Sequence, residues 1–142
     1  MIWPARIRDW FTQRSRKKSL GDRGEDAAAK FLKRQGFHIL ARGLDSPLGE
    51  LDIVAVDGRT VVFVEVKTRR SDDAGRPSEA IDQRKEQRMT QAALAYLKSN
   101  RLLNYSARFD VVAIMWPDDA RKPAIEHFKN AFSPVGVGQF FS

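Results

Sequence analysis

The chain has 142 residues, no cysteine and a formal net charge of +7 at pH 7. This length fits one domain with a single buried core. The lack of cysteine excludes disulfides, thiolate zinc sites and cysteine nucleophiles. No apolar run approaches the roughly 20 residues that span a bilayer, and the first residues lack the features of a secretory signal. We therefore expect a cytoplasmic protein.

Basic residues are concentrated at the start of the chain. Positions 1–20 hold six basic residues and one acidic residue, whereas positions 21–142 hold 19 basic and 17 acidic residues. Apolar residues lie among the early arginines at near-helical spacing: Ile2, Trp3, Ile7, Trp10 and Phe11. We expect residues 1–18 to form a basic amphipathic helix or a disordered arm, and residues 19–142 to form a single domain. Contact with nucleic acid, a membrane surface or a protein partner would each suit the arm.

The sequence of the first half of the domain predicts one helix followed by strands. Ser19 is a suitable N-cap, and Gly36 suits the left-handed position after a helix. The apolar runs after it alternate with turn residues, which indicates strands. In chain order we expect a helix at 19–35, a strand at 37–40, a loop at 44–49, and strands at 50–57 and 60–68 joined by a turn at Asp57-Gly58.

The sequence of the second half predicts a second helix and the last strands of the sheet. Apolar residues lie along one line of this helix with one lysine among them, as Ile81, Lys85, Met89, Ala92 and Tyr96. We expect a basic loop at 69–77, a helix at 78–99, strands at 108–116 and 124–128, and an irregular tail. Strands 50–57 and 60–68 are apolar on both faces, as in a sheet covered by helices on both sides. The fold class predicted is α/β, with a mixed central sheet flanked by helices.

Acidic residues interrupt the two apolar strands of the hairpin. With Gly58-Arg59 at its tip, Asp52 would face Glu65, and with Asp57-Gly58 at its tip Glu50 would face Glu65. Both registers place these carboxylates and Lys67 on one face, because side chains alternate along a strand. Like charges opposed across a ladder repel one another, so a cation should lie between them. Glu50, Asp52 and Glu65 offer the oxygen ligands that Mg²⁺ or Mn²⁺ prefers over zinc.

Two simpler interpretations stay open for these acidic residues. In the hairpin, Lys67 could neutralise one carboxylate in an ordinary ion-pair cluster. Glu25 precedes Ala28 by three and Leu32 by seven, which places it on the inward face of the first helix. It could complete the metal site, or it could only complement the helix dipole.

Other chemistries find little support in the chain. His38 and His127 are isolated on strand patterns, which favours packing or surface roles, and neither a P-loop nor a nucleophile elbow is present. A basic concentration follows the hairpin, and it includes Arg69, Arg70, Lys85 and Arg88. Such a patch suits an anionic polymer, although a solvated basic surface is the alternative.

The chain resembles the YraN-like family of small bacterial predicted endonucleases. Three runs carry the resemblance: Gly24-Glu25-Asp26-Ala27-Ala28, Gly49-Glu50-Leu51-Asp52-Ile53-Val54 and Phe63-Val64-Glu65-Val66-Lys67-Thr68-Arg69. The match covers about residues 18–115. That family is similar to archaeal Holliday-junction resolvases and belongs to the PD-(D/E)xK nuclease superfamily. The resemblance implies a restriction-endonuclease-like core in the order α-β-β-β-α-β, and thus a nuclease-like domain at 19–142.

The resemblance also implies roles for individual residues. Asp52 and Glu65 would bind Mg²⁺ or Mn²⁺, Lys67 would orient the attacking water, and Glu25 would complete the site directly or through water. Leu51 stands where the superfamily name has proline, a position that varies among its members. The function implied is metal-dependent endonuclease activity on DNA, with RNA as an open alternative. Branched DNA and a homodimer follow from the similarity to resolvases, and a noncatalytic nucleic-acid-binding protein is the alternative.

Overall fold

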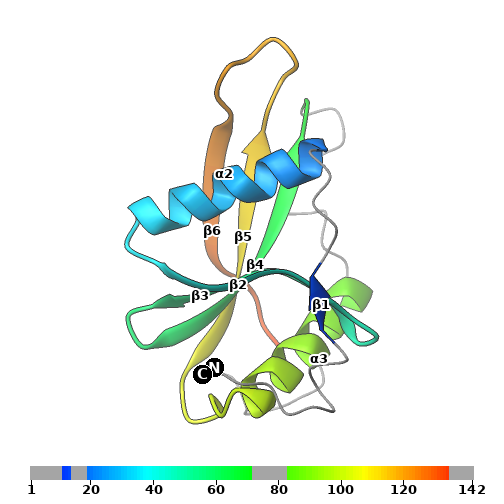
Figure 1. Ribbon diagram of the computed structural model, residues 1–142, viewed down its shortest axis with the longest axis vertical. Helices are drawn as coiled ribbons and strands as arrows, with labels where there is room; N and C mark the ends of the chain where they lie inside the picture. The colour runs from blue at the N-terminus through cyan, green and yellow to red at the C-terminus, as the bar shows by residue number, and fades with distance from the viewer. Residues whose placement is uncertain (1–10, 14–18, 72–82, 135–142) are drawn as a thin grey trace.

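A mixed β-sheet lies between two helices in the computed structural model, which describes residues 11–13, 19–71 and 83–134 (Figure 1). Within these ranges the six strands follow the order of the sequence, and only β4 and β5 run parallel. The predicted α/β fold and its restriction-endonuclease-like core are confirmed, with β6 added at one edge. The elements are β1 (Thr12–Gln13), α2 (Leu20–Arg34), β2 (His38–Ser46), β3 (Gly49–Asp57), β4 (Thr60–Arg69), α3 (Gln83–Ser99), β5 (Ala107–Met115) and β6 (Ala124–Phe132).

Helix α2 covers one face of the sheet and begins at the predicted cap. The backbone N–H of Asp22 donates to the Ser19 hydroxyl at 3.1 Å, and the Asp22 carboxylate accepts from the Ser19 amide, which forms a capping box. The inward side chains Ala28 and Leu32 are fully buried against strands β3 and β4. Neither α2 nor α3, the helices within the described residues, has the length and apolar character needed to cross a membrane.

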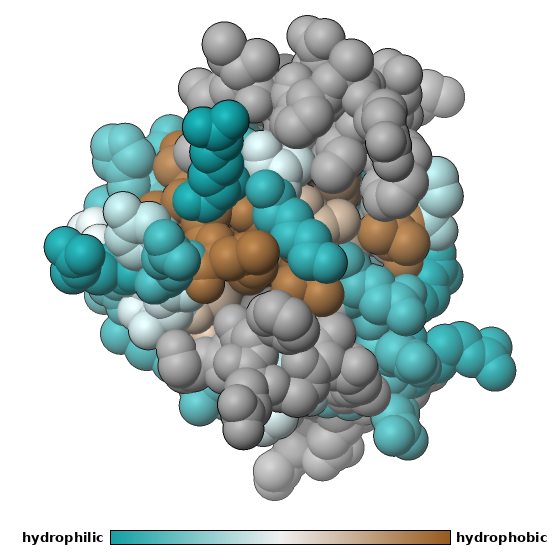
Figure 2. Space-filling view, turned by 90° about the horizontal axis from the view of Figure 1, so that it is seen from below, coloured by the Kyte–Doolittle hydropathy of each residue, from teal (hydrophilic) through white to brown (hydrophobic). Residues whose placement is uncertain are grey.

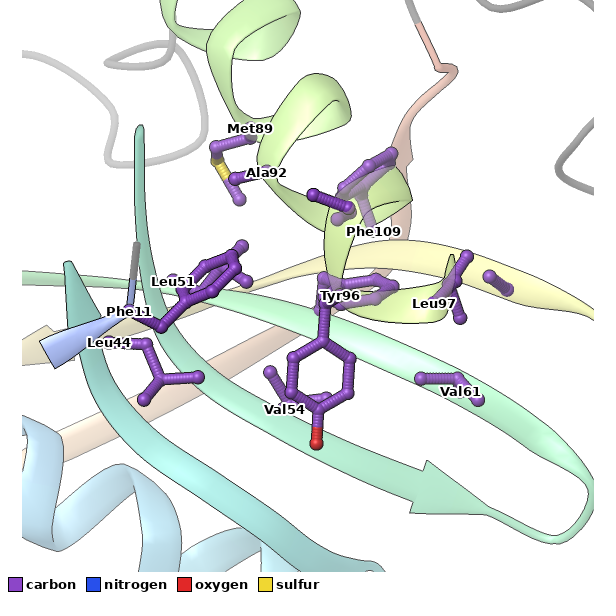
Figure 3. Packing of buried hydrophobic residues seen from close by; sticks show 14 residues of the cluster. Phe11, Leu44, Leu51, Val54, Val61, Met89, Ala92, Tyr96, Leu97 and Phe109 are labelled. Atoms are coloured by element: carbon purple, nitrogen blue, oxygen red, sulfur yellow. The ribbon is translucent and has the colours of Figure 1, made fainter. Parts of the chain in front are cut away.

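Helix α3 covers the opposite face of the sheet. Figure 3 shows Met89, Ala92 and Tyr96 directed from the helix toward buried side chains of the strands, among them Leu51 and Val54. The predicted apolar line of this helix is therefore confirmed from Lys85 onward, whereas its predicted start at 78–82 lies outside the described residues. Seen from the α3 end, brown apolar side chains are visible between hydrophilic ones (Figure 2).

Strand β2 is longer than the sequence predicts. Residues 44–46, expected in a loop, pair with β3 up to Ser46–Gly49, so only Pro47 and Leu48 form the turn. The Ser46 hydroxyl donates to the Gly49 carbonyl at 2.8 Å and accepts from its amide at 3.2 Å, which closes this turn locally. Gly43 has a φ of 59°, a backbone conformation that favours glycine. The loop prediction was wrong because turn-forming residues here lie inside a bent strand.

Part of the predicted N-terminal arm belongs to the sheet. Thr12 and Gln13 pair with Asp45 and Leu44 of β2, and Phe11 is buried in the core on the α3 side. A helix or disordered chain is therefore wrong for residues 11–13, because an edge strand can satisfy backbone groups of β2 while it buries Phe11. Residues 1–10 and 14–18 lie outside the described residues, as do both tryptophans of this segment.

Strand β6 also extends beyond its predicted end at residue 128. It continues to Phe132, which pairs with Phe109 of β5 across an irregularity in the register. The two rings stack with centroids 4.6 Å apart. Polar residues such as Asn130 interrupt the apolar pattern, so the sequence did not predict this part of the strand. An edge strand tolerates polar residues because one side faces solvent.

Candidate active site

The β3–β4 hairpin opens into a fork at its base. Asp57 pairs with Thr60 and Ile53 with Val64, so Gly58-Arg59 forms the tip, the first of the two predicted registers. Beyond Ile53 and Val64 the pairing between β3 and β4 ends, while β3 stays paired with β2 and β4 with β5. In Figure 1 the β2–β3 hairpin turns toward β1 and α3, whereas β4 continues toward the start of α2. Asp52 and Glu65 are the first residues past the fork.

Asp52 is held in this fork by a backbone amide. Its Oδ2 accepts a hydrogen bond from the N–H of Val66 at 2.9 Å, and the residue is only 8% exposed. The side chain thus satisfies an amide of β4 that has lost its partner strand. It also borders a groove of about 290 Å³, which Glu25, Val66 and Thr68 line from the neighbouring elements. The carboxylate therefore has a fixed position and access to solvent on the α2 side.

Glu65 lies between two lysines on the α3 side of the fork, whereas Asp52 borders the groove on the α2 side, so the single face predicted for these carboxylates is wrong. Regular alternation fails here because the β3–β4 ladder ends at Ile53 and Val64. Its Oε1 is 2.5 Å from the Nζ of Lys85 and 3.4 Å from the Nζ of Lys67, and the residue is 5% exposed. Burial, followed by repulsion from Asp52, raises the pKa of Glu65 although both lysines oppose the shift. The Asp52 carboxylate is therefore close enough to destabilise the charge on Glu65. This repulsion is the electrostatic condition that a cation between the two would relieve.

The two lysines differ in their tendency to hold a proton. Burial, followed by the neighbouring Lys85, lowers the pKa of Lys67 despite its contact with Glu65. Burial is the largest single effect on Lys85 and would lower its pKa, but the hydrogen bonds to Glu65 and Lys67 together with the charges of Glu65 and Asp52 raise it overall. Of the pair, Lys67 is thus the amine that gives up a proton more readily.

Glu25 reaches the groove because α2 approaches β4 closely. Figure 1 shows the blue start of α2 beside the green end of β4. A Cβ on Gly24 would lie 2.9 Å from the Cβ of Thr68 and closer still to its Oγ1, so only glycine fits. The next residue, Glu25, lines the groove with Asp52, and its Oε1 lies 3.7 Å from the Nε of Arg42. The inward face predicted for Glu25 is confirmed, whereas metal ligation by Glu25 stays a proposal.

The predicted metal ligands do not form a complete cage. Within the described residues, no three or more histidine, aspartate or glutamate side chains gather closely enough to hold a metal by themselves. Glu50 is exposed and lines a second cavity with Arg84, Lys85 and Arg88 on the α3 side, apart from the groove of Asp52. However, Mg²⁺ usually keeps several waters and needs only one or two protein carboxylates. Asp52 and Glu65 supply this number of carboxylates at the fork, and their ligation of a metal stays a proposal.

The predicted phosphate-binding residues are spread around the fork. The Arg69 side chain donates to the Thr68 carbonyl at 3.1 Å, and the Arg70 Nε lies 3.1 Å from the Asp118 carboxylate. Arg88 is exposed beside the α3 cavity. Lys85 instead contacts Glu65. It therefore belongs to the candidate site and not to the phosphate-binding patch predicted from the sequence. Its place on the apolar line of α3 was the sequence signal for this inward position.

A buried charge network on β5 and β6 was not predicted. Asp110 is fully buried and bonded by Arg108 Nε at 3.0 Å, by His127 Nε2 at 2.8 Å and by the Asn130 amide at 2.9 Å. Arg108 also donates to Asp57 at 2.9 Å. An aspartate inside an apolar strand signals such partners, because an unpaired buried charge is costly. The members of this network lie on β3, β5 and β6 and bond to one another, so we regard it as structural.

The family match spans the elements that build the fork. A sequence model described as "Uncharacterised protein family UPF0102" matches residues 24–114. The chain belongs to the UPF0102 family. A UPF0102 protein of Rhodopirellula baltica is 42% identical over 144 residues, which cover 96% of this chain and 86% of that protein. A UPF0102 protein of Geobacter sulfurreducens is 49% identical over 117 residues, covering 81% and 89%. The YraN-like resemblance is thus confirmed, and the UPF0102 names state no activity.

Proposed function

We propose that this UPF0102 protein is a metal-dependent endonuclease that hydrolyses phosphodiester bonds in DNA. One observation carries the proposal: two buried, mutually repelling carboxylates, Asp52 and Glu65, meet where β3 and β4 separate, with Lys67 beside them. Keeping two like charges this close costs stability, and the two lysines beside Glu65 offset this cost only in part, since the pKa of Glu65 stays raised. A divalent cation converts the same arrangement into an attractive one.

Each side chain has a distinct task under this proposal. Asp52 and Glu65 hold Mg²⁺ or Mn²⁺, which supplies Lewis-acid polarisation of the phosphate and activation of water when bound. Lys67 positions the attacking water and can accept a proton, which fits its lowered pKa. Glu25 faces the same groove as Asp52 and orders the water shell on the α2 side.

The substrate is recognised through its backbone. Arg69 and Arg88 lie on β4 and α3, which flank the fork, and Arg70 directly follows β4. From there they can contact phosphates on either side of the scissile bond. Phosphate contacts position a nucleic acid without reading its sequence. Branched DNA and a two-fold symmetric homodimer extend the proposal by the likeness to resolvases.

The proposal is tested by cleavage assays on linear, nicked and branched DNA with and without Mg²⁺ or Mn²⁺. Asp52→Asn is the informative variant because it keeps an oxygen for the Val66 amide but removes the charge. Glu126→Gln, which changes an exposed carboxylate of β6, is the matched control. We expect divalent-dependent cutting by the wild type and the control, and none by Asp52→Asn. Equal cutting by all three proteins would point to a contaminating nuclease and contradict the assignment.

A second function is favoured by the contact between Lys85 and Glu65. The ammonium already neutralises this carboxylate at 2.5 Å, as an ion-pair cluster would. Under this alternative the protein binds nucleic acid and does not cut it. Binding that is equal in wild type and Asp52→Asn, with no cutting of any substrate by either, would support it.

A further inference from the structure

A second basic groove lies outside the candidate active site. It has a volume of about 580 Å³ and runs between α2 and the loop that joins β5 to β6. Trp116, Pro123 and Ile125 line it with apolar surface. Its cations come from both walls, as Arg23, Lys30 and Arg34 on α2 and Arg121 and Lys122 on the loop.

The charge in this groove is segregated from the rest of the body. Residues 21–142 hold 19 basic and 17 acidic side chains, yet the groove collects five cations with a single carboxylate, Asp26. That carboxylate is already bonded to Arg42. Within the described part of the chain, none of the five cations forms an ion pair. A positive potential is therefore concentrated in a concave surface, which attracts a polyanion.

The cations of α2 form a row along the helix, which suits contact with an extended ligand. Arg23, Lys30 and Arg34 are separated by seven and four residues, so they project from one side of the helix. The Arg23 guanidinium stacks on the Trp116 ring at 4.2 Å, and the indole N–H donates to the Ala120 carbonyl. Stacking holds the guanidinium plane in place and leaves its N–H edge to donate to a phosphate.

We propose that this basic groove binds the phosphate backbone of a second segment of the nucleic acid whose first segment occupies the fork. The inference rests on the proposed function for its ligand. The same helix connects both places: Glu25 faces the fork, while Arg23 and Lys30 face the groove. A nucleic acid that passes over α2 thus meets metal-binding carboxylates on one side and a row of cations on the other. Recognition in the groove is electrostatic and independent of sequence.

Binding without cleavage tests this groove separately from the nuclease proposal. The probe is fluorescein-labelled duplex and branched DNA, measured by anisotropy with the full-length protein in EDTA over a range of salt concentrations. The test variant is Lys30→Glu with Arg121→Glu, one exposed residue from each wall. The control is Arg59→Glu with Lys98→Glu, which changes the net charge equally at exposed positions on the β3–β4 tip and the end of α3.

We expect the groove variant to bind roughly tenfold more weakly or worse, with a salt slope reduced by about 2, and the control to stay close to wild type. Equal losses in both variants, or none in the groove variant, would overturn the inference, as would a wild-type protein that binds no DNA. A loss of binding to phosphatidylserine vesicles with DNA binding intact would assign the groove to membranes and overturn it too. DNA binding lost only in the groove variant would support the groove even where the wild type never cuts DNA.

Discussion

The backbone amide of Val66 donates to the Asp52 carboxylate at 2.9 Å, across the point where β3 and β4 separate. In a continuous hairpin this amide would face a backbone carbonyl of the partner strand. Here the side chain takes that place, so the divergence of the strands and the position of the carboxylate depend on each other. Asp52 stabilises the fork because its carboxylate accepts the hydrogen bond of the Val66 amide. The separated strands in turn surround the Asp52 side chain and leave it largely buried.

Replacing Asp52 should separate this structural role from the chemical one. Asp52→Asn keeps an acceptor for Val66, so we expect thermal unfolding close to that of wild type, whereas Asp52→Ala should lose about 1–3 kcal/mol of stability. Both should reduce divalent-dependent cleavage by at least about 100-fold, which is no detectable cutting in the substrate assays proposed above. Calorimetry and single-turnover cleavage measure the two effects. A folded Asp52→Asn protein that cleaves DNA at the wild-type rate would contradict the proposed metal-binding role of Asp52.

The close approach of α2 to β4 should make Gly24 intolerant of any side chain. In Gly24→Ala the new methyl would overlap Thr68, and we expect a loss of about 1–3 kcal/mol in unfolding free energy together with displacement of Glu25. Gly21→Ala in the same helix is the control, since its methyl would meet only the Ser19 hydroxyl at 3.7 Å. That control should gain up to about 1 kcal/mol from helix propensity. Equal stabilisation by both alanines in chemical denaturation would show that the contact is not tight.

Lys85 should compete with a divalent cation for Glu65. Lys85→Gln removes the ammonium at 2.5 Å from Oε1, so Mn²⁺ should bind more tightly and raise the melting temperature more than it does in wild type. Without divalent cations the variant should be less stable by about 1 kcal/mol, because the lysine is partly exposed. Arg88→Gln, on the same helix, controls for the loss of a nearby positive charge. An unchanged Mn²⁺ affinity in Lys85→Gln, measured by titration calorimetry, would argue against competition.

The Asp110 network should govern acid stability. Hydrogen bonds from His127, Arg108 and the Asn130 amide outweigh burial and hold the pKa of Asp110 below its usual 3.8. Because the folded-state pKa is the lower one, its stabilisation is complete above pH 3.8 and is lost as the pH falls through the folded-state pKa.

At neutral pH, Asp110→Asn should cost roughly 3 kcal/mol, since it leaves Arg108 with one buried partner fewer. The difference from wild type should shrink below pH 3.8. Asp118→Asn, which alters an exposed ion pair, should change stability by less than about 0.5 kcal/mol throughout. A constant difference between Asp110→Asn and wild type down to the acid limit of folding would show that Asp110 does not titrate as described.

Much of this structure follows from local rules that the sequence displays. Ser19 caps α2, Gly58 forms the hairpin tip with Arg59, and the two-sided apolar strands lie between two helices. The sequence left two registers open, each with a two-residue tip, and the structure has the one with Gly58-Arg59 at the tip, which brings Asp52 beside Glu65.

The fork itself was not within reach of sequence reasoning. Simple alternation predicts Asp52 directly opposite Glu65, but the ladder ends one pair earlier, where β3 follows β2. Whether two strands stay paired depends on their other neighbours, which are set by tertiary packing rather than by the hairpin sequence. For the same reason the edge strand at Thr12–Gln13 and the partners of Asp110 were missed. Each depends on contacts between segments far apart in the chain.

The most direct test of the account is a crystal structure grown with saturating Mn²⁺, with anomalous scattering used to locate the ion. The account predicts a peak between the carboxylates of Asp52 and Glu65, with the Lys85 ammonium moved away from Glu65 Oε1, and no such peak in Asp52→Asn. If Lys85 still holds Glu65 and no peak lies at the fork of the wild-type protein, the two carboxylates do not form a metal site.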